Sequence, residues 1–141
     1  MTTRSLLRDA ADRAATYLEG IDSRGVAPTA DAIAALARFD RALPEHPGDA
    51  AAILRELDET GSPGTSTSAG GRYFGFVIGA TLPTALAANM LATAWDQNAG
   101  LVVISPTTAK LETVALCSLL DAFHPPPKSA AALATSPTPP T

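Results

Sequence analysis

The sequence predicts a mostly helical protein with one modest domain, and three observations support this fold class. In several segments apolar residues recur at the three- and four-residue spacing of an amphipathic helix. Prolines, glycines and capping hydroxyls separate these segments from one another. The chain has 141 residues, of which 46% are hydrophobic and 17% charged, so it is long enough for one hydrophobic core and too short for two.

Three helices are expected in the first sixty residues. The second is predicted over Asp31–Arg41 with Thr29 as its capping residue, and the third over Asp49–Glu59 with Gly61 as its stop. The first is predicted over residues 4–19, where one face is formed by Leu7, Ala10, Ala14, Tyr17 and Leu18.

The second half of the chain combines a flexible-backbone loop with two apolar helices. Six of the ten glycines lie between positions 61 and 79, so a loop with close bends is expected there, with Tyr73–Ile78 as a short strand or extended segment. The fourth helix is predicted from Pro83 to about Gln97. Ser105, as a capping residue before a proline, predicts a fifth helix that runs to Phe123. Both helices are apolar on more than one face, which indicates that they require a packing partner.

A break is expected inside the uncharged stretch from Tyr73 to Trp95. At 23 residues it is long enough to span a bilayer if it were helical, which leaves a membrane-associated protein as one alternative. Pro83 disfavours helical angles at the preceding residue, and Gly75 and Gly79 weaken a helix before it. We therefore expect no continuous helix here and no membrane partner.

Composition excludes several other classes of protein. The net charge of −4 and the absence of a basic stripe argue against a nucleic-acid partner. Cys117 is the single cysteine, so no internal disulfide is possible and a cytoplasmic location is expected. Arg4 and Arg8 lie where an export signal needs an apolar stretch. Residues 124–141 hold six of the twelve prolines and are expected to be a disordered tail after the helical region 1–123.

The residue types that usually perform catalysis do not form a recognisable constellation. His46 and His124 lie beside prolines and are interpreted as exposed loop residues, and no metal-ligand spacing is present. Lys110 and Lys128 are the candidates for a Schiff base, but a solvated charge is the favoured interpretation of both. Residues alone thus predict no catalytic, cofactor-binding or metal site.

Three segments of the chain resemble, in the same order, the front of one family of enzymes. The run 71–91, Gly-Arg-Tyr-Phe-Gly-Phe-Val-Ile-Gly-Ala-Thr-Leu-Pro-Thr-Ala-Leu-Ala-Ala-Asn-Met-Leu, is similar to the aromatic opening, small-residue bend and following helix of the group II pyridoxal-phosphate-dependent decarboxylases, the relatives of the aromatic-amino-acid and glutamate decarboxylases. The run 104–114, Ile-Ser-Pro-Thr-Thr-Ala-Lys-Leu-Glu-Thr-Val, is similar to its Ser-Pro-x-x-x-x-Leu-Glu-x-x-Val helix start. The run 17–28 resembles the end of its first helix. One departure is Ala69-Gly70-Gly71-Arg72, where the family has His-Pro.

The resemblance implies substrate-side positions and a pyridoxal phosphate cofactor for the family. The bend at Gly79, Ala80 and Thr81 matches a segment that lines the substrate side of the site, and Asn98 lies in a segment that reaches the partner subunit's site; plain turns are the alternative for both. The family's phosphate loop, ring-stacking histidine, aspartate and Schiff-base lysine have no counterpart here, so this chain is not expected to bind the cofactor.

The sequence therefore predicts the N-terminal helical segment of a fold type I pyridoxal-phosphate enzyme, truncated before the cofactor-binding α/β large domain. Such a segment of an amino-acid decarboxylase, a carboxy-lyase, is expected to be inactive alone. The alternative is a helical interaction or dimerisation module that binds a full-length homologue. In both cases we expect self-association or a homologous decarboxylase subunit as the partner.

Overall fold

The computed structural model describes residues 1–79, 81–126 and 128–133, and it separates into two compact units, Met1–Leu82 and Pro83–Thr141. All the regular elements of the described residues are helical, so the predicted mostly helical fold class is confirmed.

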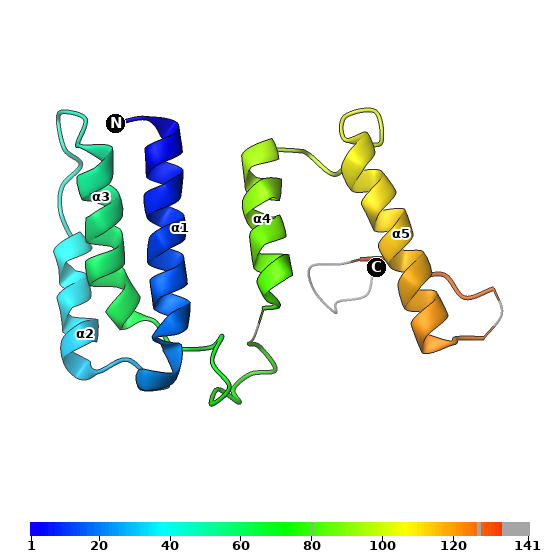
Figure 1. The fold of residues 1–141 in the computed structure, drawn as a ribbon, viewed down its shortest axis with the longest axis horizontal. Helices are drawn as coiled ribbons and strands as arrows, with labels where there is room; N and C mark the ends of the chain where they lie inside the picture. Colours follow the sequence, from blue (N-terminus) through cyan, green and yellow to red (C-terminus); the bar gives the residue numbers. More distant parts are fainter. Residues whose placement is uncertain (80, 127, 134–141) are drawn as a thin grey trace. The chain divides into compact units, whose positions relative to one another are not determined.

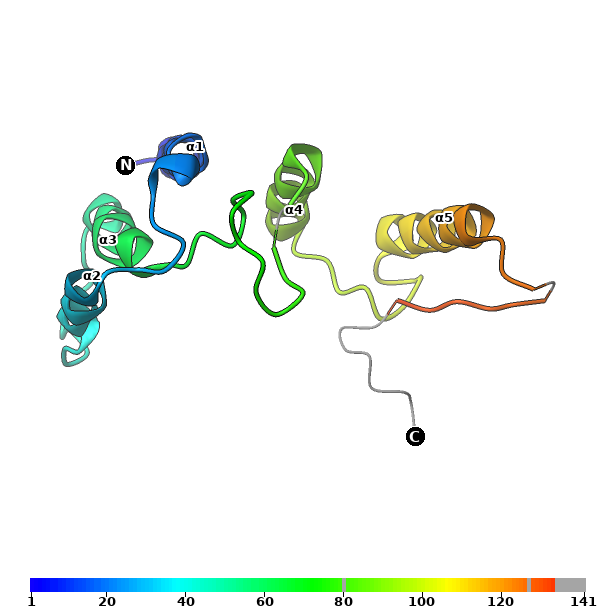
Figure 2. The same cartoon turned by 90° about the horizontal axis from the view of Figure 1, so that it is seen from below.

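The first unit contains three α-helices, joined or extended by short 3₁₀-helices and one π-helix. Figures 1 and 2 show α1 and α3 side by side, with α2 next to α3. In chain order the elements are α1 (Thr3–Glu19), η1 (Ile21–Ser23), α2 (Ala30–Ala35), η2 (Leu36–Phe39), α3 (Ala50–Glu56), η3 (Leu57–Gly61) and η4 (Ser62–Gly64).

Helix α1 matches its predicted range, and two reciprocal hydrogen bonds cap its start. The Ser5 backbone N–H donates to the Thr2 hydroxyl at 3.2 Å, and the Thr2 backbone N–H donates to the Ser5 hydroxyl at 3.0 Å. This reciprocal pair is a capping box with serine in the place usually taken by glutamate or glutamine. It satisfies two backbone donors that the helix leaves without an internal partner.

The next two helices begin where they were predicted and end differently. The Ala32 backbone N–H donates to the Thr29 hydroxyl, which confirms Thr29 as the cap of α2. The predicted end at Arg41 is wrong, because the chain tightens into η2 and Asp40 leaves helical angles at ψ 74°. Helix α3 is capped by Asp49, and its last turn widens into the π-helix η3.

An ion pair fixes the segment after η2 to α3. The two guanidinium nitrogens of Arg41 donate to the two carboxylate oxygens of Glu56 at 2.9 and 2.7 Å, which is the forked geometry of a strong pair. The Arg41 guanidinium holds the pKa of Glu56 below its ordinary value of 4.5. Arg41 thus lies outside the helix, and its side chain pairs with a residue of α3.

Between the two parts of the uncharged stretch the chain bends instead of forming a strand. The prediction of a strand or extended segment at Tyr73–Ile78 is wrong, because Phe76 and Val77 take left-handed angles and close a turn. Helix α4 (Pro83–Trp95) then begins at the proline, so the predicted break is confirmed. None of the helices in the described part of the chain is both long and apolar enough to cross a membrane.

The second unit contains α4 and α5 (Pro106–Phe123), and α5 spans its predicted range. Ser105 begins this helix, but its predicted capping role is wrong. Its side chain is fully buried, and its hydroxyl bonds the Thr108 hydroxyl instead of a backbone N–H. The helix ends where His124 turns to left-handed angles.

The described residues form a very small hydrophobic core. Ile21 is the one large hydrophobic side chain among them that is fully enclosed, at 8% exposure, and it lies close to Gly70. Thr60 and Thr67 are buried polar residues of the same unit. The single core that the composition allows is not formed by the described residues, and in the first unit α2 and α3 have only six and seven residues to cover an apolar face. Polar contacts must therefore contribute much of the order of this unit.

We predict that the first unit loses stability in acid, because protonation of Glu56 removes its ion pair with Arg41. Folding lowers the pKa of Glu56, so the ionised carboxylate stabilises the folded state. This stabilisation is fully present above about pH 5 and is lost as the pH falls through the lowered pKa. Thermal unfolding of Glu56→Gln should therefore vary less between about pH 6 and pH 3 than that of the wild type. Glu45→Gln removes the same charge at an exposed loop position, and it should keep the wild-type pH dependence. An unchanged acid dependence in Glu56→Gln would contradict this assignment.

Candidate functional site

Two of the four predicted substrate-side residues lie at a tightly closed bend. Gly79 has a φ of +135°, and a Cβ atom at this position would lie 2.6 Å from the Ser68 carbonyl oxygen, so only glycine fits. Thr81 is exposed just before α4, and Ala80 lies outside the described residues. The predicted bend is therefore present at Gly79.

Asn98 stabilises the loop that follows α4. Its side-chain oxygen accepts a hydrogen bond from the Gly100 backbone N–H at 2.9 Å, an arrangement typical of an asparagine turn. The side chain is exposed and belongs to the second unit, whereas Gly79 and Thr81 belong to the first. The alternative interpretation of Asn98 as a turn residue accounts for this geometry.

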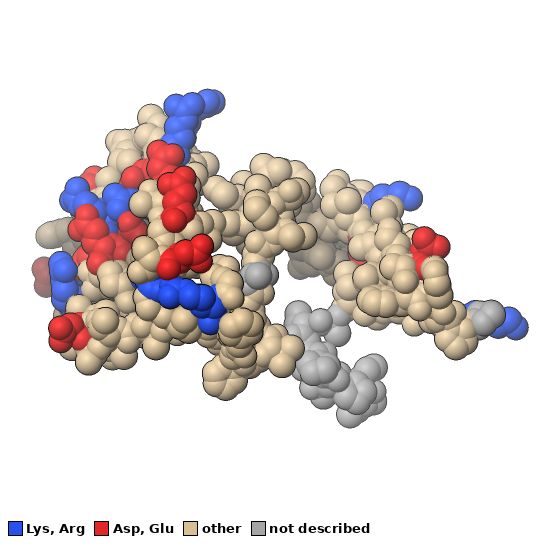
Figure 3. All heavy atoms as spheres, turned by 60° about the horizontal axis from the view of Figure 1, so that its bottom comes forward, with Lys and Arg blue, Asp and Glu red and all other residues tan. Residues whose placement is uncertain are grey.

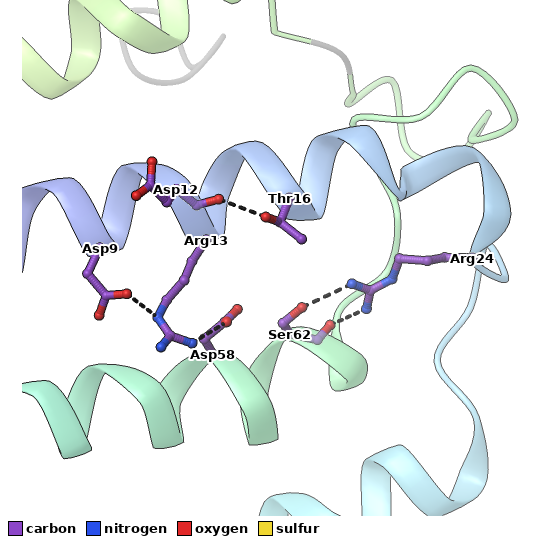
Figure 4. A network of polar contacts seen from close by, with 7 residues as sticks. All are labelled: Asp9, Asp12, Arg13, Thr16, Arg24, Asp58 and Ser62. Carbon is purple, nitrogen blue, oxygen red and sulfur yellow. Dashed lines mark hydrogen bonds and ion pairs between the residues drawn. The ribbon is translucent and has the colours of Figure 1, made fainter.

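The densest cluster of polar contacts is one that the sequence interpretation missed. Figure 4 shows two of its arginines, Arg13 on α1 and Arg24 after η1, reaching toward the η3–η4 segment. Arg13 donates from Nε to Asp9 at 3.1 Å on the same helix and from Nη1 to Asp58 on η3 at 2.9 Å. Both carboxylates raise the pKa of Arg13 above its ordinary value. This arginine thus joins α1 to η3 as a permanent cation.

Arg24 makes the second link, from the segment after η1. Its guanidinium donates to the Ser62 hydroxyl at 3.0 Å and to the Ser62 carbonyl oxygen, and it lies 4.6 Å from the centre of the Tyr17 ring. The Tyr17 hydroxyl is 2.9 Å from the Thr65 hydroxyl. The planar guanidinium group of arginine can donate two hydrogen bonds to neighbouring acceptors and stack on an aromatic ring at the same time, which the ammonium group of lysine cannot do.

The backbone around Arg24 also fixes the glycine-rich loop. Arg72 donates to the carbonyl oxygens of Asp22, at 2.7 Å, and of Arg24. The Thr67 backbone N–H donates to the Val26 carbonyl oxygen at 3.1 Å. We call Arg13, Tyr17, Arg24, Ser62 and Arg72 the arginine cluster, because three guanidinium groups join four separate segments of the first unit.

A cavity of about 300 Å³ lies beside this cluster, and its lining is balanced in charge. Arg13 and Arg24 contribute two positive charges, while Asp58 and Glu59 contribute two negative ones. Asp58 is already paired with Arg13, and Arg24 is bonded to Ser62. Because the charged and hydroxyl groups of the cluster are largely engaged with one another, we interpret the cluster as structural.

The surroundings of Lys110 lack the groups that would hold the phosphate of pyridoxal phosphate. Lys110 is exposed on α5, and the cavity of about 380 Å³ that includes Thr108 and Leu111 of the same helix has no cation in its lining. Lys128 is also exposed. A cofactor phosphate needs backbone amides at an open helix start or a basic side chain, and Pro106 removes one such amide from the start of α5. No group of three potential metal ligands occurs in the described ranges either.

Exposed apolar side chains are the outstanding feature of the second unit. Only five of the 24 charged residues of the chain follow Leu82, and Figure 3 shows almost no charge on the visible surface of α4. The helices and their connection expose eleven large hydrophobic side chains, which are Met90, Leu91, Trp95, Leu101, Val102, Val103, Ile104, Leu111, Val114, Leu119 and Phe123.

Comparison of the chain with models of known protein families, with curated proteins and with solved structures finds no match. The resemblance to decarboxylases thus depends on the segments 17–28, 71–91 and 104–114 alone.

One signal in the sequence pointed to part of the arginine cluster. Asp9 and Arg13 are four residues apart on a predicted helix, which is the spacing of a helical ion pair. The pairing of Arg13 with Asp58 and of Arg24 with Ser62 joins residues 45 and 38 positions apart, and no local pattern specifies such contacts. The cluster therefore became visible only in the fold.

Arg24→Lys should destabilise the first unit although it keeps the positive charge. Lysine cannot bond both oxygens of Ser62 while stacking on Tyr17, so we expect the free energy of unfolding to fall by about 1 kcal/mol. Chemical denaturation followed by circular dichroism measures this change. Arg4→Lys, at an exposed position near the start of α1, is the matched control and should have almost no effect. Equal stabilities of the two variants would show that Arg24 has no special structural role.

Gly79→Ala should open the bend before α4. The new methyl group would collide with the Ser68 carbonyl oxygen, so the local opening free energy should fall by about 1–3 kcal/mol. Hydrogen exchange of the Ile78 amide, which donates to the Gly75 carbonyl oxygen, reports this opening. Gly71→Ala is the control, because a Cβ there meets no atom within 4 Å. Unchanged exchange in Gly79→Ala would contradict the described bend.

Proposed function

We propose that this chain is the N-terminal helical portion of a pyridoxal-phosphate-dependent amino-acid decarboxylase, and that its own contribution is assembly. In this proposal α4 and α5 pack against a protein partner, which is a second copy or a homologous decarboxylase subunit. The chain itself performs no decarboxylation. The three ordered motifs of the sequence support the family, and the surface of the second unit supports the role in assembly.

The observation that carries the role in assembly is the exposure of the second unit. Phe123 is 77% exposed, Leu111 56% and Trp95 48%, although side chains of this size are normally enclosed. Scattered single hydrophobic residues need no explanation, but a unit with eleven of them and few charges does. Covering such a surface gains free energy at about 25 cal/mol for each Å² removed from water.

A protein partner fits this surface better than a small substrate does. The 380 Å³ cavity of the unit is lined mainly by alanine, leucine and tryptophan, with Asn89, Gln97 and Thr108 as its polar groups. A substrate pocket of an amino-acid enzyme needs charged groups to orient the substrate, and this lining offers none. Apolar helix faces without charge are instead typical of the interfaces of permanent assemblies.

The purified chain should therefore self-associate in a concentration-dependent manner, which sedimentation equilibrium measures. Leu111→Glu places a carboxylate in the apolar surface of α5 and should weaken association at least about tenfold, since burying an unpaired charge costs more than about 1.4 kcal/mol.

Thr107→Glu is the matched control for this experiment. It adds the same charge to the same helix at an exposed polar position, and it should leave the dissociation constant unchanged. A chain that stays monomeric at every concentration, and that also fails to bind a purified homologous decarboxylase, would contradict the proposed role. Binding only to the homologue would identify the decarboxylase subunit as the partner.

We further expect no stable complex between this chain and pyridoxal phosphate. Exposed lysines form imines with the free cofactor weakly and without selectivity, so little absorbance of an imine should remain after gel filtration, and carbon dioxide release from amino acids should stay at background. Lys110→Ala should change neither result. Stoichiometric retention that is lost in Lys110→Ala would overturn the proposal that the chain acts only in assembly.

A further inference from the structure

Arg24 lines two cavities of the first unit, and these cavities differ in charge. In the cavity of about 300 Å³ beside the arginine cluster, Asp58 and Glu59 balance the two arginines. The other cavity has a volume of about 370 Å³, and Arg24 is the one charged residue in its lining. The hydroxyl groups of Thr29 and Thr65 and the side chains of alanine and proline form most of its remaining walls. We call it the Arg24 cavity.

The positive charge of Arg24 has no ionic partner in the described part of the chain. Arg13 pairs with two carboxylates and Arg41 with one, whereas both acceptors of Arg24 are neutral oxygens of Ser62. The Arg24 side chain is half-buried, so water screens its charge less than it screens that of an exposed arginine. A partly buried cation without a counter-charge favours an anion from outside the chain.

The hydrogen bonds of Arg24 also leave one edge of its guanidinium group unused. Nη1 donates to the Ser62 hydroxyl and Nη2 to the Ser62 carbonyl oxygen (Figure 4). These bonds take two of the five N–H donors of an arginine. Nε and the second hydrogen of Nη2 form the other edge of the group, and in the described ranges this edge donates to no protein acceptor. Two parallel N–H groups on one edge match the two oxygens of a carboxylate.

We propose that the Arg24 cavity binds a small monocarboxylate, whose two oxygens accept hydrogen bonds from Nε and Nη2 of Arg24. Asp58 and Glu59 oppose an anion in the other cavity that Arg24 lines, and the Arg24 cavity has no such residue. The Thr29 hydroxyl already accepts the Ala32 backbone N–H, so the guanidinium group is the anchor of this site. The inference does not depend on the proposed role in assembly.

The walls of the cavity favour a carboxylate with an apolar body over inorganic phosphate. Ala27, Pro28, Ala32 and Pro63 offer apolar contacts on the sides of the cavity, and small-molecule sites typically combine such walls with a few polar groups. One guanidinium group balances one negative charge. A doubly charged phosphate would leave its second charge without a partner, and it has no apolar surface to cover these walls.

Titration of the full chain with butyrate tests the site, with amide chemical shifts of Gly25, Ala27 and Ala32 as the readout. We expect saturable shifts with a dissociation constant of the order of 1 mM, as for a ligand with few atoms. Butyramide has nearly the same shape without the charge, and it should bind at least about tenfold more weakly. Inorganic phosphate, as the second comparison, should also bind at least about tenfold more weakly.

Two variants of Ala32 place the ligand in the cavity. Ala32 is the third residue after the cap Thr29, a position at which both glutamate and glutamine stabilise a helix start, so both variants should keep α2 folded. Ala32→Glu adds a carboxylate to the lining, and Ala32→Gln adds a side chain of the same size without charge. The dissociation constant for butyrate should be at least about tenfold higher in Ala32→Glu than in Ala32→Gln.

Each contrary outcome removes one part of the inference. No saturable shift with butyrate up to about 50 mM overturns the site. Equal binding of butyrate and butyramide overturns recognition by charge, and phosphate that binds as tightly as butyrate overturns the monocarboxylate class. Dissociation constants within about twofold of each other in the two variants overturn the Arg24 cavity as the location. The role in assembly is measured separately by sedimentation and stands in each of these cases.

Discussion

The structure of the first unit depends most on the guanidinium group of Arg24. This group donates hydrogen bonds to the hydroxyl and carbonyl oxygens of Ser62 and stacks on the Tyr17 ring of α1. The backbone carbonyl oxygen of Arg24 accepts a hydrogen bond from Arg72. One residue thereby connects α1, the η3–η4 segment and the glycine-rich loop. With Ile21 as the one enclosed large hydrophobic side chain among the described residues, few apolar contacts are present to replace this connection. Helices this short are not stable in water without such tertiary contacts.

The second unit presents the opposite balance of forces. Its helices have few charged residues and expose leucine, valine, tryptophan and phenylalanine side chains that the described residues do not enclose. Polar contacts thus order much of the first unit, whereas the second unit leaves its large apolar side chains exposed. The cavity beside the arginine cluster has a lining of balanced charge, whereas the cavity of the second unit has a mainly apolar one.

Local rules predicted the helices well and their connections poorly. Thr29 and Pro83 marked real helix starts, because capping and a missing backbone N–H are effects of immediate neighbours. Arg41 was placed inside a helix because its distant partner Glu56 was not visible in the pattern. The residues Tyr73–Ile78 predict a short strand or extended segment because aromatic and β-branched residues favour strands. The turn at Phe76 and Val77 goes with contacts of Arg72 and Gly79 to distant backbone, which no local pattern shows. For the candidate site, the bend at Gly79 was predictable from glycine spacing, whereas the arginine cluster required contacts far apart in sequence.

The central claim is that α4 and α5 need a protein partner while the first unit orders itself. Hydrogen exchange of the full chain at low and high protein concentration tests this claim directly. We predict that amides of α1 and α3 exchange at the same rate at both concentrations, and that amides of α4 and α5 become protected only at the higher one. Strong protection of α4 and α5 in the dilute monomer would contradict the account, because it would mean that the second unit is stable without any partner.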